Sequence, residues 1–173
     1  MRNWTKYILA FLSILVFRLI PFRAPNVEPI MSAIMPIGKT YGPVMSLFFA
    51  AFSILLYDMI TSGIGIWTFF TAMTYGIIGL CSYYYFKKRS GWKHYGAYAA
   101  AATIAFDAIT GLIPGPVFFG QPFMGALIGQ IPFTLMHLVS NVSFAILLSP
   151  VLEKWFVKQH ERSFAFHLTS RIQ

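Results

Sequence analysis

The polar residues of the last apolar segment have a spacing that could form a binding surface. Helical positions i, i+4, i+7 and i+11 hold Gln130, Thr134, His137 and Asn141, so all four project from one helix face. In lipid, such a face must turn toward other helices or a cavity. We favour an interhelical hydrogen bond for the deepest residue, Asn141, and we consider Gln130 and His137 ligand candidates. One histidine without a second histidine or cysteine nearby does not indicate a metal site.

A second face of this kind begins at Trp67. Thr71 and Tyr75 follow it at intervals of four residues, so aromatic and hydroxyl groups lie along one side of a helix. Two interpretations are equally open. Trp67 could be an interfacial anchor, or the three side chains could form one wall of a pocket for a flat, polar ligand.

Acidic residues are scarce, and three of the five lie near the ends of apolar segments: Glu28, Asp58 and Asp107. Charge is costly at membrane depth, so such residues are usually paired or functional. Arg18 and Arg23 are the available partners on that side, and pairs that only tie loops to helices are the alternative. A carboxylate at the carboxyl end of a helix opposes the helix dipole, so simple caps are a poor explanation of Asp58 and Asp107.

Known catalytic signatures are missing from the sequence. It contains no HExxH, no GxSxG and no phosphate-binding loop. We therefore predict that the chain is not an enzyme, holds no cofactor or metal, and does not bind ATP itself.

The composition indicates what must position these residues. Hydrophobic residues make up 57% of the 173 residues and charged residues 10%, whereas soluble domains carry about 25% charged residues. So few charges cannot cover a water-facing surface. The apolar runs are long rather than alternating, which favours membrane helices over a barrel. The net charge is +8, and the basic residues behind it lie at the ends of these runs. This placement indicates membrane topology rather than nucleic-acid binding.

We predict an all-α membrane protein with six transmembrane helices. The expected segments are 4–20, 27–37, 41–57, 67–86, 95–110 and 122–150. The second segment is short for a span, because 11 residues cover only about 16 Å as a helix, so a re-entrant segment is the alternative. Residues 1–158 would form a single domain, followed by a basic cytoplasmic tail at 159–173.

Charge placement supports a crossing by the short second segment. With six spans and both ends in the cytoplasm, eleven of the thirteen Lys and Arg residues lie inside, and only Arg18 and Arg23 lie outside. Without that crossing, the cluster 87–93 and the basic C-terminal end would fall on opposite sides. The loops 20–29, 58–67 and 107–121, rich in Pro, Gly and acidic residues, would then share the outer face. Binding sites commonly lie on such loops.

The chain resembles the substrate-binding S-component of an energy-coupling-factor vitamin transporter. Six short spans, the loop Arg23-Ala-Pro-Asn-Val-Glu-Pro29 and the stretch Asp58-x4-Gly63-x-Gly65-x-Trp67-Thr68, running into Thr74-Tyr75-Gly76-Ile77-Ile78-Gly79, carry the resemblance. It implies a bacterial plasma-membrane protein that binds a micronutrient from outside. The partners implied are a transmembrane coupling subunit and two cytoplasmic ATPases. The pocket it implies would use Asn26, Glu28, Asp58, Trp67, Thr71, Tyr75, Asp107, Gln121, Gln130 and His137.

Two other functions remain open. The chain could be a non-enzymatic scaffold or assembly subunit of a cell-envelope complex, which would bind partners through its helices and would need no pocket. It could also be a membrane-embedded hydrolase that uses Asp58, Asp107 and His137. The hydrolase requires these groups within hydrogen-bond reach, and we expect His137 to lie too deep for that.

Overall fold

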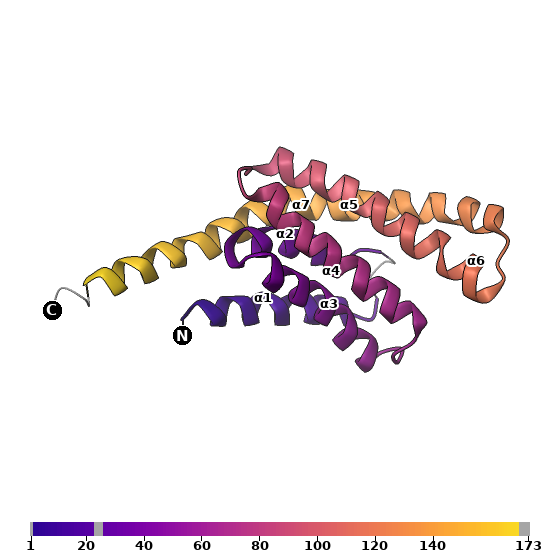
Figure 1. The fold of residues 1–173 in the computed structure, drawn as a ribbon, viewed down its shortest axis with the longest axis horizontal. Coiled ribbons are helices and arrows are strands. Elements are labelled where there is room, and N and C mark those ends of the chain that lie inside the picture. The colour runs from indigo at the N-terminus through magenta and orange to yellow at the C-terminus, as the bar shows by residue number, and fades with distance from the viewer. Residues whose placement is uncertain (1, 23–25, 170–173) are drawn as a thin grey trace.

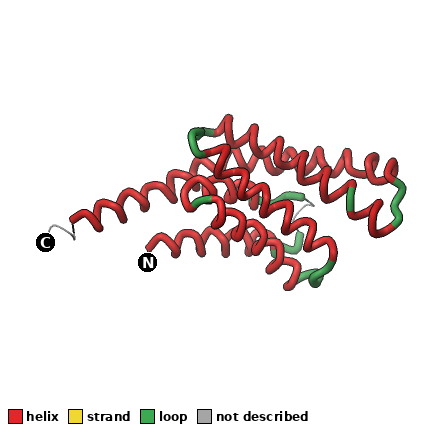
Figure 2. Tube along the Cα trace, in the orientation of Figure 1, coloured by secondary structure: helices red, strands yellow, loops and turns green. Residues whose placement is uncertain are grey.

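The part of the chain that the structure describes is helical, with short connecting loops (Figure 2). The computed structural model describes the backbone of residues 2–22 and 26–169 and the side chains of residues 4–22 and 26–156. Within these ranges the helices are α1 (Arg2–Arg18), α2 (Ile30–Tyr41), α3 (Pro43–Ile60), α4 (Ile66–Phe86), α5 (Trp92–Leu112), α6 (Pro114–Phe119) and α7 (Phe123–Thr169). The prediction of an all-α protein is confirmed.

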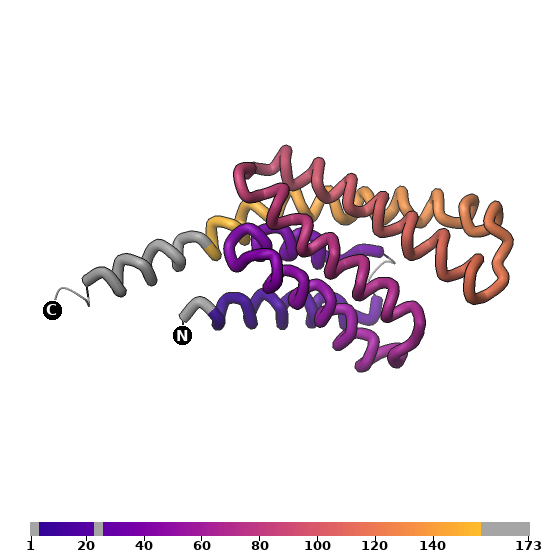
Figure 3. The backbone as a smooth tube through the Cα atoms, in the orientation of Figure 1, coloured from indigo at the N-terminus to yellow at the C-terminus, as the bar shows by residue number. Residues whose placement is uncertain are grey.

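The helices run back and forth between two ends of an elongated bundle. Figure 1 shows α5 beside α7 and α3 beside α4, with α6 at one end and both ends of the drawn chain toward the other. The path of the chain can be followed by colour in Figure 3. The end of the bundle where α1 and α3 finish and α4 starts is therefore far from the end where α2 finishes and α5 starts.

The short helix α2 forms the centre of the bundle. Every residue from Ile30 to Gly38 is buried, and α2 contacts α3, α4, α5 and α7. Its last turn is closed by Gly42, whose φ of +94° favours glycine, and Pro43 then occupies the first turn of α3. The segment that looked weakest as a membrane span is thus the most enclosed helix of the described chain.

Small residues let α2, α3 and α4 approach closely. A Cβ atom on Gly79 would lie 2.7 Å from the backbone oxygen of Ser46, so only glycine fits there without a shift. The Ser46 hydroxyl donates to the backbone oxygen of Ile34 at 2.9 Å, and the Ser82 hydroxyl donates to that of Gly79 at 2.7 Å. Close backbone approach with buried hydroxyl bonds is typical of helix packing in lipid.

Four stretches of the described chain are long and apolar enough to cross a membrane. They are Pro43–Ile60, Ile66–Phe86, Trp92–Phe119 and Phe123–Phe156. With 17 and 12 residues, α1 and α2 are shorter than the about 20 residues that usually span a bilayer. Large apolar side chains face outward along the bundle, including Phe52, Phe69 and Val139. These features fit a multi-pass membrane protein.

Several boundaries differ from the predicted ones. We predicted a loop from Asp107 to Gln121, but α5 continues to Leu112 and α6 follows at once. Pro114 fits the first turn of α6, where its missing N–H costs nothing, and Gly120 ends that helix in the left-handed region. We interpreted these residues as loop formers, whereas here they begin and end a helix. The last helix also continues beyond residue 150, since the backbone of α7 is helical to Thr169.

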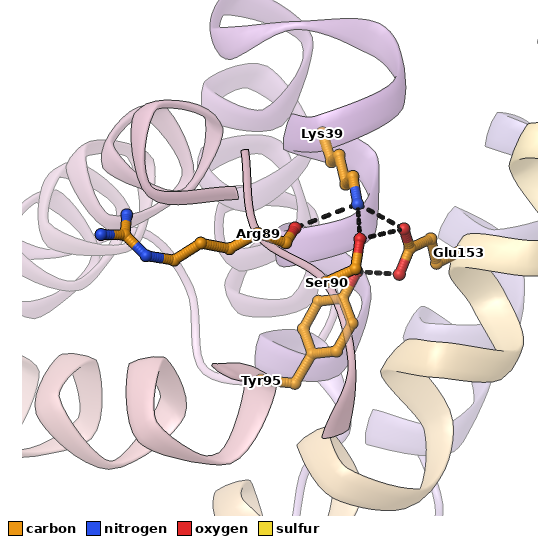
Figure 4. Close-up of polar contacts among 5 residues, drawn as sticks. All are labelled: Lys39, Arg89, Ser90, Tyr95 and Glu153. Carbon is orange, nitrogen blue, oxygen red and sulfur yellow. Dashed lines mark hydrogen bonds and ion pairs between the residues drawn. The ribbon is translucent and has the colours of Figure 1, made fainter. Parts of the chain in front are cut away.

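A polar cluster joins four parts of the chain at the end where α2 finishes (Figure 4). The Lys39 ammonium lies 2.5 Å from a Glu153 carboxylate oxygen, and it also donates to Ser90 and to the backbone oxygen of Arg89. The Ser90 and Tyr95 hydroxyls donate to Glu153 at 3.0 and 2.8 Å. The cluster ties α2, the α4–α5 loop, α5 and α7 together.

Candidate functional site

A cavity of about 560 Å³ lies at the opposite end, where α1 and α3 finish and α4 begins. Nine of the ten predicted residues line it: Asn26, Glu28, Asp58, Trp67, Thr71, Tyr75, Gln121, Gln130 and His137. The tenth, Asp107, lies behind the wall in contact with His137. The structure therefore brings together side chains from loops and helices far apart in the sequence, and their role in binding stays a prediction.

One wall of the cavity holds a buried ion pair. Arg18 at the end of α1 lies with Nε 2.9 Å from Oε2 of Glu28, although that N–H is not aligned for a hydrogen bond. Arg18 also donates to the backbone oxygen of Ser53 at 3.3 Å, and its guanidinium stacks 4.2 Å from the Tyr57 ring centroid. The other Glu28 oxygen accepts from the Tyr75 hydroxyl at 3.0 Å. Both charges are thus neutralised and held in place.

A second buried pair lies deeper, between α5 and α7. Nδ1 of His137 lies 2.8 Å from Oδ1 of Asp107, and the two side chains are only 2% and 1% exposed. An ionised carboxylate can only accept, so Nδ1 donates. Nε2 of His137 is buried and has no hydrogen-bond partner among the described residues. We expected His137 to be too deep to reach a carboxylate. That expectation was wrong, because Asp107 itself lies inside α5.

Asp58 lies in the last turn of α3, close to the start of α4. One of its carboxylate oxygens accepts from the Thr68 hydroxyl at 2.6 Å, and that hydroxyl also accepts from the backbone N–H of Gly65 at 3.2 Å. Thr68 therefore caps the first turn of α4 and fixes Asp58 at the same time. Asp58 is half-buried, so it remains accessible from the cavity.

Aromatic rings form much of the remaining wall. Trp67 stacks on Phe119 of α6 with ring centroids 5.6 Å apart and an angle of 4° between the planes. Deeper in the cavity, Phe106 packs against Tyr75 and His137, at centroid distances of 4.4 and 5.7 Å. The walls are therefore suited to a flat ring.

Two glycines make room for the two glutamines at the site. A Cβ atom on Gly111 would lie 1.8 Å from Oε1 of Gln130, and one on Gly115 would lie 2.2 Å from Oε1 of Gln121. Gln130 also donates to the Thr134 hydroxyl at 3.3 Å. Both glycines lie in the segment 107–121 that we interpreted as a loop, and they determine where the glutamine amides can lie.

Sequence reasoning left out several residues that line the cavity: Arg18, Phe106, Thr110, Gly111 and Phe133. Arg18 was considered only as an ion-pair partner. Phe133 precedes His137 by one helical turn, and Thr110 follows Asp107 by three residues, so helical spacing could have found both. Nothing in their residue types separates the two phenylalanines from the others in the chain.

Asn141 has the structural role that we favoured. Its amide donates to the Thr103 hydroxyl at 2.9 Å, and the bond joins α7 to α5. Asn141 is fully buried and does not line the cavity.

Comparisons with protein families, with curated proteins and with solved structures found no match to this chain. Its function must therefore be inferred from the geometry of the chain itself.

Proposed function

We propose that the protein is the substrate-binding membrane subunit of a transporter that takes up a vitamin or related micronutrient. The cavity would hold the ligand, and a partner coupling module would supply energy from ATP. The resemblance to S-components of energy-coupling-factor transporters suggests this role, and the cavity supports it independently of the resemblance.

One observation carries the proposal. The cavity, about 560 Å³ in volume, has the size of a small-molecule site. His137 also lines the cavity, and its Nε2 is buried without a partner in the described chain. Burying a polar atom without a hydrogen bond is costly, so a ligand that reached and satisfied this nitrogen would bind with a gain. A scaffold subunit would have no use for such a site.

We further propose six spans, with both chain ends in the cytoplasm and the cavity open to the outside. The basic residues Lys39, Lys88 and Lys93 would then face the cytoplasm, in accord with the positive-inside rule. The topology can be tested with single cysteines in a Cys81→Ser background. A membrane-impermeant thiol reagent should label Ile64→Cys in intact cells, and Lys88→Cys only after permeabilisation, because both positions are exposed. The reverse pattern would contradict the orientation.

The proposed partners are a transmembrane coupling subunit and two cytoplasmic ATPase subunits. The purified chain should then bind its ligand without hydrolysing ATP. Uptake by cells should require both the chain and an ATPase, and ATP depletion should abolish uptake while leaving binding intact.

The direct test is mass spectrometry of small molecules that co-purify with the protein from cells grown in rich medium. We expect one micronutrient in near-stoichiometric amount, and its loss from His137→Ala protein that still folds. Protein that retains no small molecule, and is not stabilised by any of a set of vitamins and their precursors, would overturn the proposal.

The Asp107–His137 pair also favours a second candidate, a membrane-embedded hydrolase. A carboxylate that orients an imidazole leaves the other ring nitrogen free to act as a general base. In that case the co-purified molecule, or a panel of ester and amide substrates, should be turned over by the wild type and not by His137→Ala. Binding without turnover would favour the transporter subunit.

A further inference from the structure

Two of the three carboxylates at or beside the cavity have a basic partner in the described chain, and the third does not. Glu28 is paired with Arg18, and Asp107 is paired with His137. Asp58 is different, because no described Lys, Arg or His side chain lies within ion-pair distance of its carboxylate. That carboxylate accepts instead from the neutral hydroxyl of Thr68 at 2.6 Å. The cavity wall therefore carries a carboxylate without a cationic partner in the described chain. Arg23, the second partner that we considered for these carboxylates, lies outside the described residues.

Asp58 lies between two helix ends of opposite sign. The residue belongs to the last turn of α3, whose carboxyl end carries partial negative charge, and its carboxylate contacts Thr68 in the first turn of α4, whose amino end carries partial positive charge. The two dipoles oppose each other at this place, so the full charge of the carboxylate remains the main electrostatic feature.

The protonation state of His137 does not reverse this balance. If His137 is protonated, it neutralises Asp107, and if it is neutral, the pair adds a further negative charge. Arg18 is already neutralised by Glu28 in both cases. The groups described at the cavity are therefore negative overall in either state.

The aromatic part of the wall favours the same sign of charge. Trp67, Tyr75, Phe106 and Phe133 all line the cavity. The faces of such rings attract cations, and they also stack on flat rings. Trp67 lies on the open side of the cavity, because it is 46% exposed, whereas Tyr75 is 1% exposed and lies on the closed side. Asp58, which is half-buried, is thus nearer the exposed side than His137.

We infer that the cavity takes a cationic ligand, namely an aromatic ring carrying an amine that is protonated at neutral pH. The amine binds the Asp58 carboxylate, and the ring lies among Tyr75, Phe106 and Phe133, where its polar edge can reach Nε2 of His137. This inference rests on the proposed function, because it names the class of substrate for the same cavity.

Three indole compounds of similar size test the inference. Tryptamine carries a positive charge, indole-3-acetamide is neutral and indole-3-acetate is negative. Their affinities are measured by calorimetry on the full-length protein in lipid nanodiscs, after bound small molecules have been removed. We expect tryptamine to bind at least about tenfold more tightly than the amide, since charge-assisted hydrogen bonds are among the strong ones, and the acetate to bind most weakly.

Asp58→Asn is the decisive variant, because the amide oxygen can still accept from Thr68 while the charge is lost. The tryptamine-to-amide ratio should fall to near one in Asp58→Asn and be largely retained in Asp58→Glu. Equal or reversed preference in the wild type, an unchanged ratio in Asp58→Asn, or no binding of tryptamine would each overturn the inference. A micronutrient found in the co-purification experiment would leave the proposed function standing in all three cases.

Discussion

His137 and Asp107 are thirty residues apart and lie on different helices, yet Nδ1 of one is 2.8 Å from Oδ1 of the other. The contact joins α5 to α7, the pair of helices that form one side of the cavity. It also fixes the orientation of the imidazole, because the carboxylate accepts from one ring nitrogen and leaves the other free. A structural bond between two helices thus determines which nitrogen of His137 would be available to the proposed ligand.

Replacing Asp107 with Asn should weaken both functions of this contact. The Asn amide can still reach Nδ1, but the bond loses its charge, and the imidazole loses its fixed tautomer. We expect the free energy of unfolding to fall by about 2 kcal/mol and ligand retention to fall by at least about tenfold. Thermal unfolding and mass spectrometry of the co-purified ligand measure the two effects.

Thr103→Val is the matched control for Asp107→Asn. It removes the acceptor of the Asn141 amide, which is another buried hydrogen bond between the same two helices. We expect a similar loss of stability with ligand retention unchanged, because neither residue lines the cavity. Equal losses of ligand in both variants would mean that the Asp107–His137 pair only holds the helices together.

Helical spacing predicted those parts of the site that depend on one helix at a time. Trp67, Thr71 and Tyr75 share a face, as do Gln130 and His137, and both faces line the cavity. Spacing could not show how the helices meet. The pairing of Asp107 with His137 depends on α5 continuing through Asp107 to Leu112. The Gly and Pro residues of the segment 107–121 suggested a loop there instead.

The central position of α2 could not be predicted from the sequence either. A run of apolar residues has the same pattern whether lipid or other helices surround it. Burial of Ile34 depends on the small residues Ser46, Gly79 and Ser82 of the neighbouring helices, which let α3 and α4 approach. That information is spread over three segments, and it becomes visible only once they are packed.

Gly111→Ala should alter the site while leaving the fold intact. The new methyl group would lie 1.8 Å from Oε1 of Gln130, which is the flexible end of a side chain and can swing away. Alanine also favours the helix over glycine by about 1 kcal/mol. We therefore expect an unchanged or slightly higher unfolding temperature, with ligand retention reduced several-fold by the displaced amide.

Gly125→Ala is the control for this change, since nothing lies within 4 Å of its added Cβ and Gly125 does not line the cavity. Its unfolding temperature should likewise be unchanged or slightly higher, because the preference of the helix for alanine is the same, whereas ligand retention should stay close to that of the wild type. Full ligand retention in Gly111→Ala would show that the position of the Gln130 amide does not matter for binding.

Gly79→Ala should damage the fold itself. Its methyl group would lie 2.7 Å from the backbone oxygen of Ser46, so α3 and α4 would have to separate. Overpacking of this kind costs about 1–3 kcal/mol. Gly76→Ala, one turn earlier in α4, is a matched control because its nearest contact would be an ordinary 3.5 Å to Leu47. Thermal unfolding should separate the two variants, and equal stability would argue against close packing at Gly79.

The Arg18–Glu28 pair offers a test in which two changes together do less harm than either change alone. Both side chains are about nine-tenths buried. Removing one partner from such a pair costs about 3–5 kcal/mol, because the other charge remains buried without compensation. Arg18→Met leaves the Glu28 carboxylate buried without its partner, and Glu28→Gln leaves the Arg18 guanidinium buried without its partner.

The double variant removes both charges, and the amide oxygen introduced by Glu28→Gln can still accept from the Tyr75 hydroxyl. We expect it to be more stable than Arg18→Met or Glu28→Gln alone, by about 1–3 kcal/mol in a double-mutant cycle measured by unfolding without ligand. Additive losses would mean that the two groups do not interact energetically, despite the 2.9 Å between them. Because net charge at the cavity is the same in wild type and double variant, any preference for cationic ligands should survive the double change and still depend on Asp58.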